Sequence, residues 1–374
     1  MHKHQINKGL AAILIGFSAI SGSAEAKSDA SSPFVHAASA CLIDVRSGRI
    51  LYEKNGQQPM RIASLTKIVT GWIAIKSGKL NTMVTVSNFA ARQEGSSVYL
   101  RSGERVKMHD LLYAMMMRSG NDAAMAIAEA VAGSNQRFAQ LMNEEARRLH
   151  LAHTHFANPH GLDQKGHYAS ADDLATMTAA ALRNPVFHQV VNTKYYRIQR
   201  STEPAGTRLK NKNKLLWMME GADGVKTGYT KAAGRCLAAS ASRSGRQVAL
   251  VLLDDPSDWV DAKNLLNYGL QAYRLVDVAT IRQRPLRLPI RDGIRPSVAV
   301  VPINRILYPL RVDEAAAVTY RITQKKIRAP IHTGDKLGDI CVTLHGQALG
   351  KTALVAAEDM PANSWWGKLR GLFS

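Results

Sequence analysis

Residues 61–70, RIASLTKIVT, place a serine and a lysine inside an otherwise apolar run. Ser64 and Lys67 are three residues apart, close to one helical turn, so both side chains face the same way in a helix. The apolar pattern predicts that helix over residues 64–77. Apolar neighbours lower the pKa of an ammonium group, which lets a lysine take a proton from a serine hydroxyl. The pair is therefore either an activated nucleophile or an ordinary exposed pair on a surface helix.

A second short motif, Ser119-Gly120-Asn121, interrupts a helical pattern over residues 109–133. We predict a helix, a break at this triplet and a second helix, with Asn121 and Asp122 as capping residues of the second helix. The triplet alone fits a plain turn between two helices. In an active site, its hydroxyl would relay a proton and its amide would hold a substrate carbonyl.

A third motif, Lys226-Thr227-Gly228, precedes a predicted pair of strands. The lysine and the threonine are suited to bind a carboxylate, and a glycine lets a substrate approach the backbone closely. A similar triplet occupies residues 76–78, at the end of the helix that carries the serine and lysine pair. It cannot face that pair across a cleft, so we assign it no role.

The order of predicted elements indicates one α/β domain over residues 35–275. Strands come first, helices follow, and strands and a helix end the segment, so we expect a mainly antiparallel sheet in which the first strands pair with the last. Beyond residue 278 helical periodicity gives way to short alternating runs, which predict a small all-β domain over residues 278–357. The strands are predicted at 38–53, 223–228 and 234–254, and the helices at 64–77, 109–133, 135–149, 170–183 and 258–274.

Both ends of the chain carry targeting patterns. Residues 1–26 have two lysines, a short apolar run and a terminal Ala-Glu-Ala, which predicts a cleaved signal peptide and export. The apolar run is too short to favour the alternative, a membrane anchor. Residues 358–374 include apolar side chains that fall on one helical arc, which predicts an amphipathic helix on a membrane surface rather than a frayed tail. These side chains are Trp365, Trp366, Leu369, Leu372 and Phe373.

The 374-residue chain has a formal net charge of +20, which favours an anionic partner. Anionic lipid or a negatively charged polymer fits an exported protein, and we expect no nucleic-acid partner. Five histidines lie between residues 150 and 167, but their spacing fits no familiar metal motif. We therefore predict no metal site and no cofactor.

The three motifs occur in the order S-x-x-K, S-x-N, K-T-G, and this order resembles the triple motif of penicillin-binding proteins and serine β-lactamases. The chain resembles D-alanyl-D-alanine carboxypeptidases of the low-molecular-mass penicillin-binding type, peptidase family S11. The resemblance implies a five-stranded antiparallel sheet flanked by helices, a C-terminal β domain and a membrane-anchoring tail. It extends to ASLTKIVT, RSGNDAA, ANPHGLDQKGHYASADDLA, NKNKLL, GADGVKTGYTKAAGRCLAASA, LLNYG and IRAPIHTGDKLGDICVTLHG.

The resemblance also implies catalytic roles for four residues. Ser64 would attack the carbonyl of the penultimate D-Ala, with Lys67 as the base. Ser119 would carry protons towards the leaving amine, and Asn121 would orient the substrate amide. Water would then hydrolyse the acyl-enzyme and release D-Ala.

The same resemblance implies a substrate-binding strand. Lys226 would lower the pKa of Lys67 and attract the terminal carboxylate together with Thr227, beside Gly228. The backbone N–H groups of Ser64 and Tyr229 would form the oxyanion hole. One departure stands out: many relatives have an arginine shortly after the strand that here ends at Asp254, and residues 254–262 contain none.

The implied partners are peptidoglycan stem peptides as substrates and β-lactams as covalent inhibitors. The implied location is periplasmic, peripheral on the outer face of the cytoplasmic membrane. A D,D-endopeptidase or transpeptidase on the same scaffold is the main alternative. A class A β-lactamase would need a glutamate to activate water, and NPHGLDQKG, the segment that could hold it, has none. A non-catalytic murein-binding protein would not need the intact triple motif.

Overall fold

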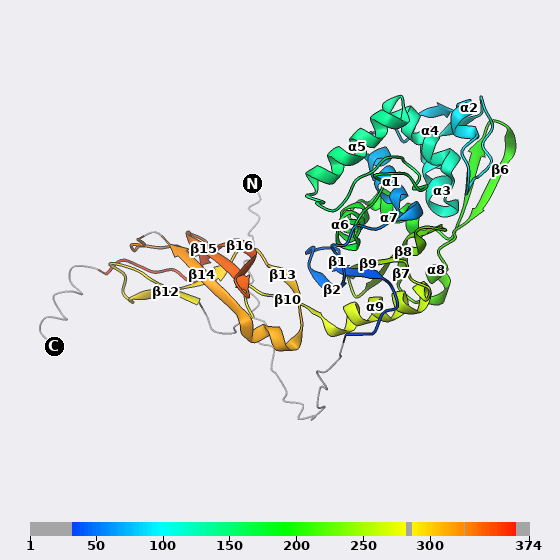
Figure 1. Cartoon of the computed structure of the whole chain (residues 1–374). Helices are drawn as coiled ribbons and strands as arrows, with labels where there is room; N and C mark the ends of the chain where they lie inside the picture. Colours follow the sequence, from blue (N-terminus) through cyan, green and yellow to red (C-terminus); the bar gives the residue numbers. More distant parts are fainter. Residues whose placement is uncertain (1–31, 282–285, 325, 364–374) are drawn as a thin grey trace, which may run out of the picture.

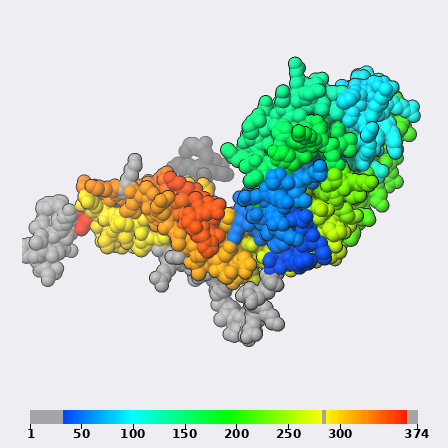
Figure 2. Space-filling model, in the orientation of Figure 1, coloured from blue at the N-terminus to red at the C-terminus, as the bar shows by residue number. Residues whose placement is uncertain are grey.

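The computed structural model describes residues 32–281, 286–324 and 326–363. The predicted signal peptide over 1–26 lies outside the described residues, as does the tail from residue 364. Figure 1 shows a helix-rich body, blue to yellow-green, beside a β-rich body, yellow to red, and Figure 2 shows the elongated surface of the two. The described helices include none with the length and apolar character needed to cross a bilayer.

A five-stranded antiparallel sheet forms the centre of the helix-rich body, as the sequence predicted. Its first strands pair with its last, and the register places Ser39 opposite Leu253. The third motif lies on β7, which is an edge strand and so presents alternate N–H groups to the side away from its neighbour. The strand order is β2-β1-β9-β8-β7, with β1 (Ser39–Asp44), β2 (Ile50–Lys54), β7 (Ala222–Thr230), β8 (Gly234–Arg243) and β9 (Arg246–Leu253).

Helices cover both faces of this sheet (Figure 1), because its strands are apolar on both sides. On β8, Cys236 and Ala238 belong to the apolar cluster with the helical region, whereas Leu237 and Ala239 belong to the cluster under α9 (Asp258–Ala272). This alternation is the two-residue period of a strand. The helical region contains α1 (Lys67–Lys76), α3 (Met108–Arg118), α4 (Asn121–Ala132), α5 (Asn135–Arg148), α6 (Ala171–Leu182) and α7 (Pro185–Asn192).

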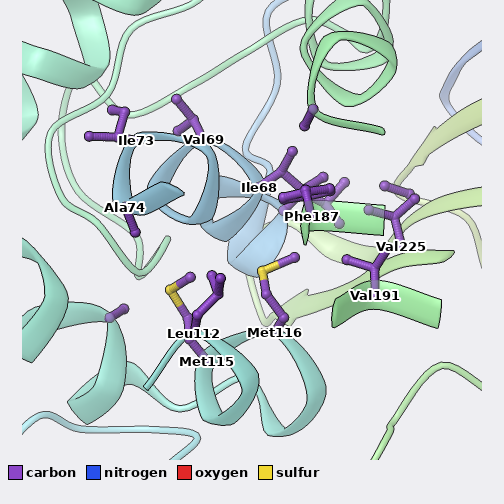
Figure 3. Close-up of a cluster of buried hydrophobic side chains, with 14 of the residues drawn as sticks. Ile68, Val69, Ile73, Ala74, Leu112, Met115, Met116, Phe187, Val191 and Val225 are labelled. Atoms are coloured by element: carbon purple, nitrogen blue, oxygen red, sulfur yellow. The ribbon is translucent and has the colours of Figure 1, made fainter. Parts of the chain in front are cut away.

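Helix α1 is buried between the sheet and the other helices. Figure 3 shows Leu112, Met115 and Met116 of α3 on one side of α1 and Val69 and Ile73 of α1 on the opposite side. Ile68 lies beside Phe187 of α7, with Val191 of the same helix nearby. A Cβ added at Gly71 would lie 3.2 Å from Leu112 Cδ1, so the two helices pack closely. Each fully buried aliphatic side chain contributes about 1.5–3 kcal/mol, so packing fixes the start of α1, where Lys67 lies.

The structure also contains elements that the sequence did not predict. A four-stranded sheet, β3-β4-β5-β6, covers one end of the helical region. Two of its strands have three residues each and the others are largely exposed, so they lack the apolar alternation that marks a strand. The unpredicted elements are β3 (Met83–Thr85), β4 (Arg105–Lys107), β5 (Tyr195–Arg200), β6 (Glu203–Lys210), α2 (Asn88–Ala91), α7 and α8 (Leu215–Met218).

The C-terminal body is rich in β structure, as predicted. Five strands form a sheet in the order β11-β12-β16-β15-β14, and β10 pairs with β13. A 3-10 helix, η2 (Val312–Ala317), precedes β14. The strands are β10 (Arg274–Asp277), β11 (Leu286–Pro289), β12 (Ser297–Pro302), β13 (Leu307–Leu310), β14 (Val318–Gln324), β15 (Lys336–Leu344) and β16 (Gln347–Ala356).

One predicted boundary in this body needs correction. Residues 358–363, predicted as the start of the amphipathic helix, continue the β body: Met360 bridges Ile331 and Ala362 bridges Gly293. Met360 is fully buried in the apolar cluster of this body, which explains why this part of the tail is not helical.

Arg49, in the turn before β2, joins the two bodies. Its guanidinium donates to the carbonyl of Pro309 at 2.6 Å and to Glu314 Oε2 at 2.9 Å. It also lies 5.2 Å from the ring centroid of Tyr273 and 5.3 Å from that of Tyr308. Charge-assisted hydrogen bonds and cation–π contacts at one side chain therefore tie the sheet to the β-rich body.

Candidate active site

The first motif forms a turn that differs from the predicted continuous helix. Residues Ala63–Thr66 make a 3-10 turn, η1, and α1 begins at Lys67. Side chains three residues apart eclipse one another in a 3-10 turn, which brings the Ser64 hydroxyl and the Lys67 amine together. Lys67 Nζ donates to Ser64 Oγ at 2.9 Å. Ala63 has φ of 45°, a left-handed conformation that turns the chain immediately before the serine.

Lys67 is fully buried and holds three oxygen partners. Besides Ser64, its amine donates to Asn121 Oδ1 at 2.7 Å and to the carbonyl of His160 at 2.6 Å. Burial lowers the pKa of Lys67 well below its usual value, and the charges of Lys226 and Lys212 lower it further. All three oxygens are formally neutral, so they support the amine without the charge of an ion-pair partner.

Asn121 and Asp122 do not cap α4 as predicted, because Gly120 is the N-cap. The amide nitrogen of Asn121 donates to the carbonyl of Glu94 at 2.5 Å, while its oxygen accepts from Lys67. The Asp122 carboxylate accepts from backbone N–H groups of residues 98 and 100. The two side chains thus hold the loop over residues 94–100, and Asn121 also holds Lys67, instead of capping the start of α4.

The second motif breaks the helical pattern where the sequence predicted. Ser119 has φ of 65° and ends α3 in the left-handed conformation, and α4 begins at Asn121. Ser119 is nearly buried, and it lines the same pocket as Ser64. The two serines therefore border one space, although they are 55 residues apart in the chain.

The third motif places its lysine behind the pocket wall. Lys226 is almost fully buried, and its amine donates to the carbonyl of Thr227 at 2.6 Å. Burial, with the charge of Lys212, lowers the pKa of Lys226 to about 7. Thr227 and Tyr229 are more exposed and line the pocket.

Gly228 lets β7 approach the turn that carries the serine. A Cβ at this position would lie 3.2 Å from the backbone nitrogen of Ser64 and 3.2 Å from Ala63 Cβ. These distances are tighter than most Cβ contacts, so any larger residue here would push β7 and the turn apart by a few tenths of an ångström. Because of this close approach, Ser64 and Tyr229, whose N–H groups are the two predicted oxyanion donors, belong to segments that lie side by side.

The pocket has a volume of about 680 Å³ and is lined mainly by polar and cationic side chains. It brings together five of the predicted site residues, while Lys67, Asn121 and Lys226 lie buried behind its wall. The lining residues are Ser64, Ser96, Ser119, Lys212, Lys214, Thr227, Gly228, Tyr229, Arg235, Asp258 and Trp259.

The sequence did not single out Lys212, Lys214 and Arg235 as site residues. The two lysines belong to the basic run RLKNKNK, which on composition alone fits a solvated surface. Lys212 is an exposed residue whose backbone N–H donates to the carbonyl of Met117, and partial desolvation lowers the pKa of its amine. The end of this basic run therefore lines the pocket, a position that its composition did not indicate.

Two histidines of the run between residues 150 and 167, His160 and His167, are buried next to Thr66 and Lys67. Burial and the charge of Lys67 lower the pKa of His160 to about 3, and burial lowers that of His167 to about 4. His167 Nε2 lies 2.7 Å from Thr66 Oγ1. In the part of the chain that the structure describes, no three acidic, histidine or cysteine side chains are grouped to hold a metal ion.

Comparison with known proteins shows which families the chain matches. The family described as D-alanyl-D-alanine carboxypeptidase matches residues 26–257, and that described as penicillin-binding protein 5, C-terminal domain, matches residues 284–362. The D-alanyl-D-alanine carboxypeptidase DacF of Bacillus subtilis is 32% identical over 366 residues, covering 94% of this chain and 94% of that protein.

Solved structures agree. Penicillin binding protein 5 from Haemophilus influenzae has a TM-score of 0.68 and 28% identity, covering 88% of this chain and 98% of that chain. A mutant of the Streptomyces K15 DD-transpeptidase has a TM-score of 0.60 and 29% identity, covering 64% of this chain and 99% of that chain. The fold and the match over more than half of its length show that the chain belongs to the D-alanyl-D-alanine carboxypeptidase family, peptidase family S11.

Proposed function

We propose that this chain is a serine-type D-alanyl-D-alanine carboxypeptidase whose nucleophile is Ser64. The family and its relatives make it a hydrolase of the low-molecular-mass penicillin-binding type. The observation that carries the residue assignment is the contact of Lys67 Nζ with Ser64 Oγ at 2.9 Å, at the wall of the pocket. A buried amine of lowered pKa beside a pocket hydroxyl is the arrangement that an activated serine requires.

In the first half of the reaction, neutral Lys67 takes the proton of Ser64 as Oγ attacks the carbonyl carbon of the penultimate D-Ala. The carbonyl oxygen becomes an oxyanion, which the N–H groups of Ser64 and Tyr229 stabilise. Ser119 gives its hydroxyl proton to the nitrogen of the leaving D-Ala and takes the proton held by Lys67, which returns Lys67 to its neutral form. The C–N bond then breaks, which leaves the peptide esterified to Ser64.

In the second half, water attacks the ester carbonyl and gives a proton to the site base. The ester bond breaks, Ser64 regains its proton, and the shortened stem peptide leaves. Asn121 positions Lys67 in this cycle through its amide oxygen, while its amide nitrogen is held by the carbonyl of Glu94. An asparagine amide has a second N–H and a second lone pair, which suit it to orient the substrate amide as well.

Stem peptides of peptidoglycan are the substrates, and β-lactams bind the same site. The β-lactam carbonyl takes the place of the scissile amide, so Ser64 becomes acylated and remains blocked. A D,D-transpeptidase is the second candidate, because a DD-transpeptidase shares the scaffold over 64% of this chain. In that reaction an amine instead of water attacks the ester.

The protein is exported, as its relatives imply. We further place it in the periplasm, on the outer face of the cytoplasmic membrane, with the amphipathic sequence at its C-terminus as the anchor. Support for this anchor comes from the tryptophans, leucines and phenylalanine that fall on one helical arc of residues 364–374. The β-rich body then lies between the anchor and the helix-rich body, which contains the active site.

The test uses mature protein with a fluorescent penicillin and with a pentapeptide ending in D-Ala-D-Ala. We expect a covalent adduct on Ser64 and release of free D-Ala. The variant Ser64→Ala should lose both, while Ser102→Ala, at an exposed serine outside the pocket, should retain both.

Three outcomes would contradict the assignment. Activity retained by Ser64→Ala would remove Ser64 as the nucleophile. Rapid turnover of penicillin would indicate a β-lactamase, and cleavage of cross-linked dimers alone would indicate an endopeptidase.

A further inference from the structure

Arg235 lines the active-site pocket, although it lies outside the three motifs, and residues 254–262 contain no arginine. Its side chain is 46% exposed and belongs to β8, next to the strand of the third motif. We propose that Arg235 binds the terminal carboxylate of the substrate together with Thr227. This inference rests on the proposed function and names the group that selects substrates with a free carboxylate.

Strand register places Arg235 beside the third motif. In the antiparallel pair of β7 and β8, Thr227 lies opposite Leu237, and Tyr229 lies opposite Arg235. Residues two apart on a strand share a face, so Arg235 and Thr227 lie on the same face of the sheet. They are diagonal neighbours, which is within reach of a long side chain. Leu237 packs under α9, so this is the α9 face of the sheet.

Helix α9 holds the guanidinium in position. Arg235 Nη2 donates to Asp258 Oδ1 at 2.6 Å, and the side chain of Asp258, the first residue of α9, is only 6% exposed. A guanidinium has five N–H donors, and this contact uses one of them. A tethered planar group loses little conformational freedom when it binds a second carboxylate, and its geometry suits two parallel hydrogen bonds.

The distance from the nucleophile also fits. In a D-Ala-D-Ala peptide the terminal carboxylate is one residue beyond the reacting carbonyl, and successive Cα atoms are about 3.8 Å apart. The carboxylate must therefore lie immediately beside Ser64. Gly228 contacts the backbone of Ser64, so Thr227, Tyr229 and the Arg235 side chain adjoin that position.

Charge around the pocket favours the same ligand. Arg235 and Asp258 together are neutral, so the pair attracts a carboxylate through directed N–H groups rather than net charge. Lys212 and Lys214 in the pocket wall add positive potential. A lysine presents a single charged point, whereas arginine matches the two oxygens of a carboxylate. Arg235 is therefore the side chain in this wall that can fix the orientation of the substrate.

The experiment measures acylation of Ser64 by benzylpenicillin, which has a carboxylate, and by its neutral methyl ester. For Arg235→Ala we expect the second-order rate constant with the acid to fall about 10- to 100-fold. The rate constant with the ester should stay within about twofold of wild type. Arg235→Lys keeps a charge for Asp258 but loses the planar fork, so its loss with the acid should be intermediate.

The matched control is Arg243→Ala. Arg243 lies on the same strand and the same face, eight residues after Arg235 and outside the pocket lining. Its guanidinium contacts Asn267 of α9 at 3.4 Å. It should behave as wild type with both probes. Thermal unfolding of each variant verifies that it is folded, and Arg235→Lys provides the test if Arg235→Ala does not fold.

Each contrary result has a separate meaning. Equal losses with acid and ester would make Arg235 a structural residue and overturn the proposal. No loss with either would assign the carboxylate to Thr227 and the lysines, which also overturns it. Failure of wild type to be labelled at Ser64 would overturn the proposed function itself, and that result is read before any Arg235 variant is made.

Discussion

Lys67 Nζ lies 2.7 Å from Asn121 Oδ1, and this contact joins the start of α1 to the start of α4. The carbonyl oxygen supports the amine without a negative charge. The pKa of Lys67 consequently remains lowered by burial and by the charges of Lys226 and Lys212.

Asn121→Asp should move the pH dependence of acylation. A carboxylate beside Lys67 favours the ammonium form and raises the pKa of the lysine. We expect acylation by penicillin to fall at neutral pH and to recover as the pH rises. The control is Asn88→Asp at an exposed position of α2, which should keep the wild-type profile. A uniform loss at every pH would mean that Asn121 only maintains the fold.

Lys67→Met should nearly abolish acylation. Methionine fills a similar volume but cannot accept a proton, and a positioned base typically contributes about 10²- to 10⁴-fold to the rate. Stopped-flow measurement with a fluorescent penicillin gives the rate constant. Lys76→Met provides the matched control, since Lys76 ends the same helix and contacts Glu145 at the surface. Equal rates for the two variants would remove Lys67 as the base.

Lys226 should make the stability of the protein depend on pH. Its pKa is about 7 in the folded protein against a reference value of 10.5, so the unfolded chain binds more protons between these values. Stability therefore rises with pH across that window, by at most about 1.4 kcal/mol per pH unit, and the full cost of burying the charge applies below about pH 7.

Lys226→Met lacks this dependence. Urea unfolding at pH 7.5 and 9.5 should show wild type gaining stability relative to the variant as the pH rises. Lys231→Met, at an exposed lysine next to β7, should run parallel to wild type. A constant difference between wild type and Lys226→Met at both pH values would contradict the lowered pKa.

Two truncations separate the anchor from the β-rich body. Deletion of residues 364–374 should abolish sedimentation with anionic vesicles and leave the thermal unfolding temperature unchanged. Deletion of residues 358–374 should also lower that temperature, because it removes the buried Met360 and its bridge to Ile331. Full vesicle binding by the shorter deletion would show that the anchor lies elsewhere.

Much of the catalytic body was predictable, because its elements have strong periodicity. The central sheet and the helices at 109–133 and 258–274 match their predicted positions to within a few residues. The sequence indicated that Ser64 and Lys67 lie together, but it did not indicate the 3-10 turn that joins them. The turn follows a left-handed φ at Ala63, and alanine is not a residue type that marks this conformation.

The remainder of the site depends on tertiary packing. Arg235 lies beside Thr227 only because of the register between β7 and β8, and a single sequence does not specify which side chains lie on the diagonal of a ladder. The predicted caps failed for a related reason. Asn121 is a good capping residue by type, but its amide has stronger partners in Lys67 and Glu94, which come from distant parts of the chain.

The pairing of β1 with β9 limits when the protein can fold. Ser39 lies opposite Leu253 where β1 pairs with β9 inside the sheet. The strand that is synthesised first therefore pairs with one that is synthesised more than 200 residues later. A chain exported from its N-terminus cannot complete this sheet until residue 253 has crossed the membrane. The partly exported chain therefore exposes the apolar faces of β1 on the far side of the membrane until β9 follows.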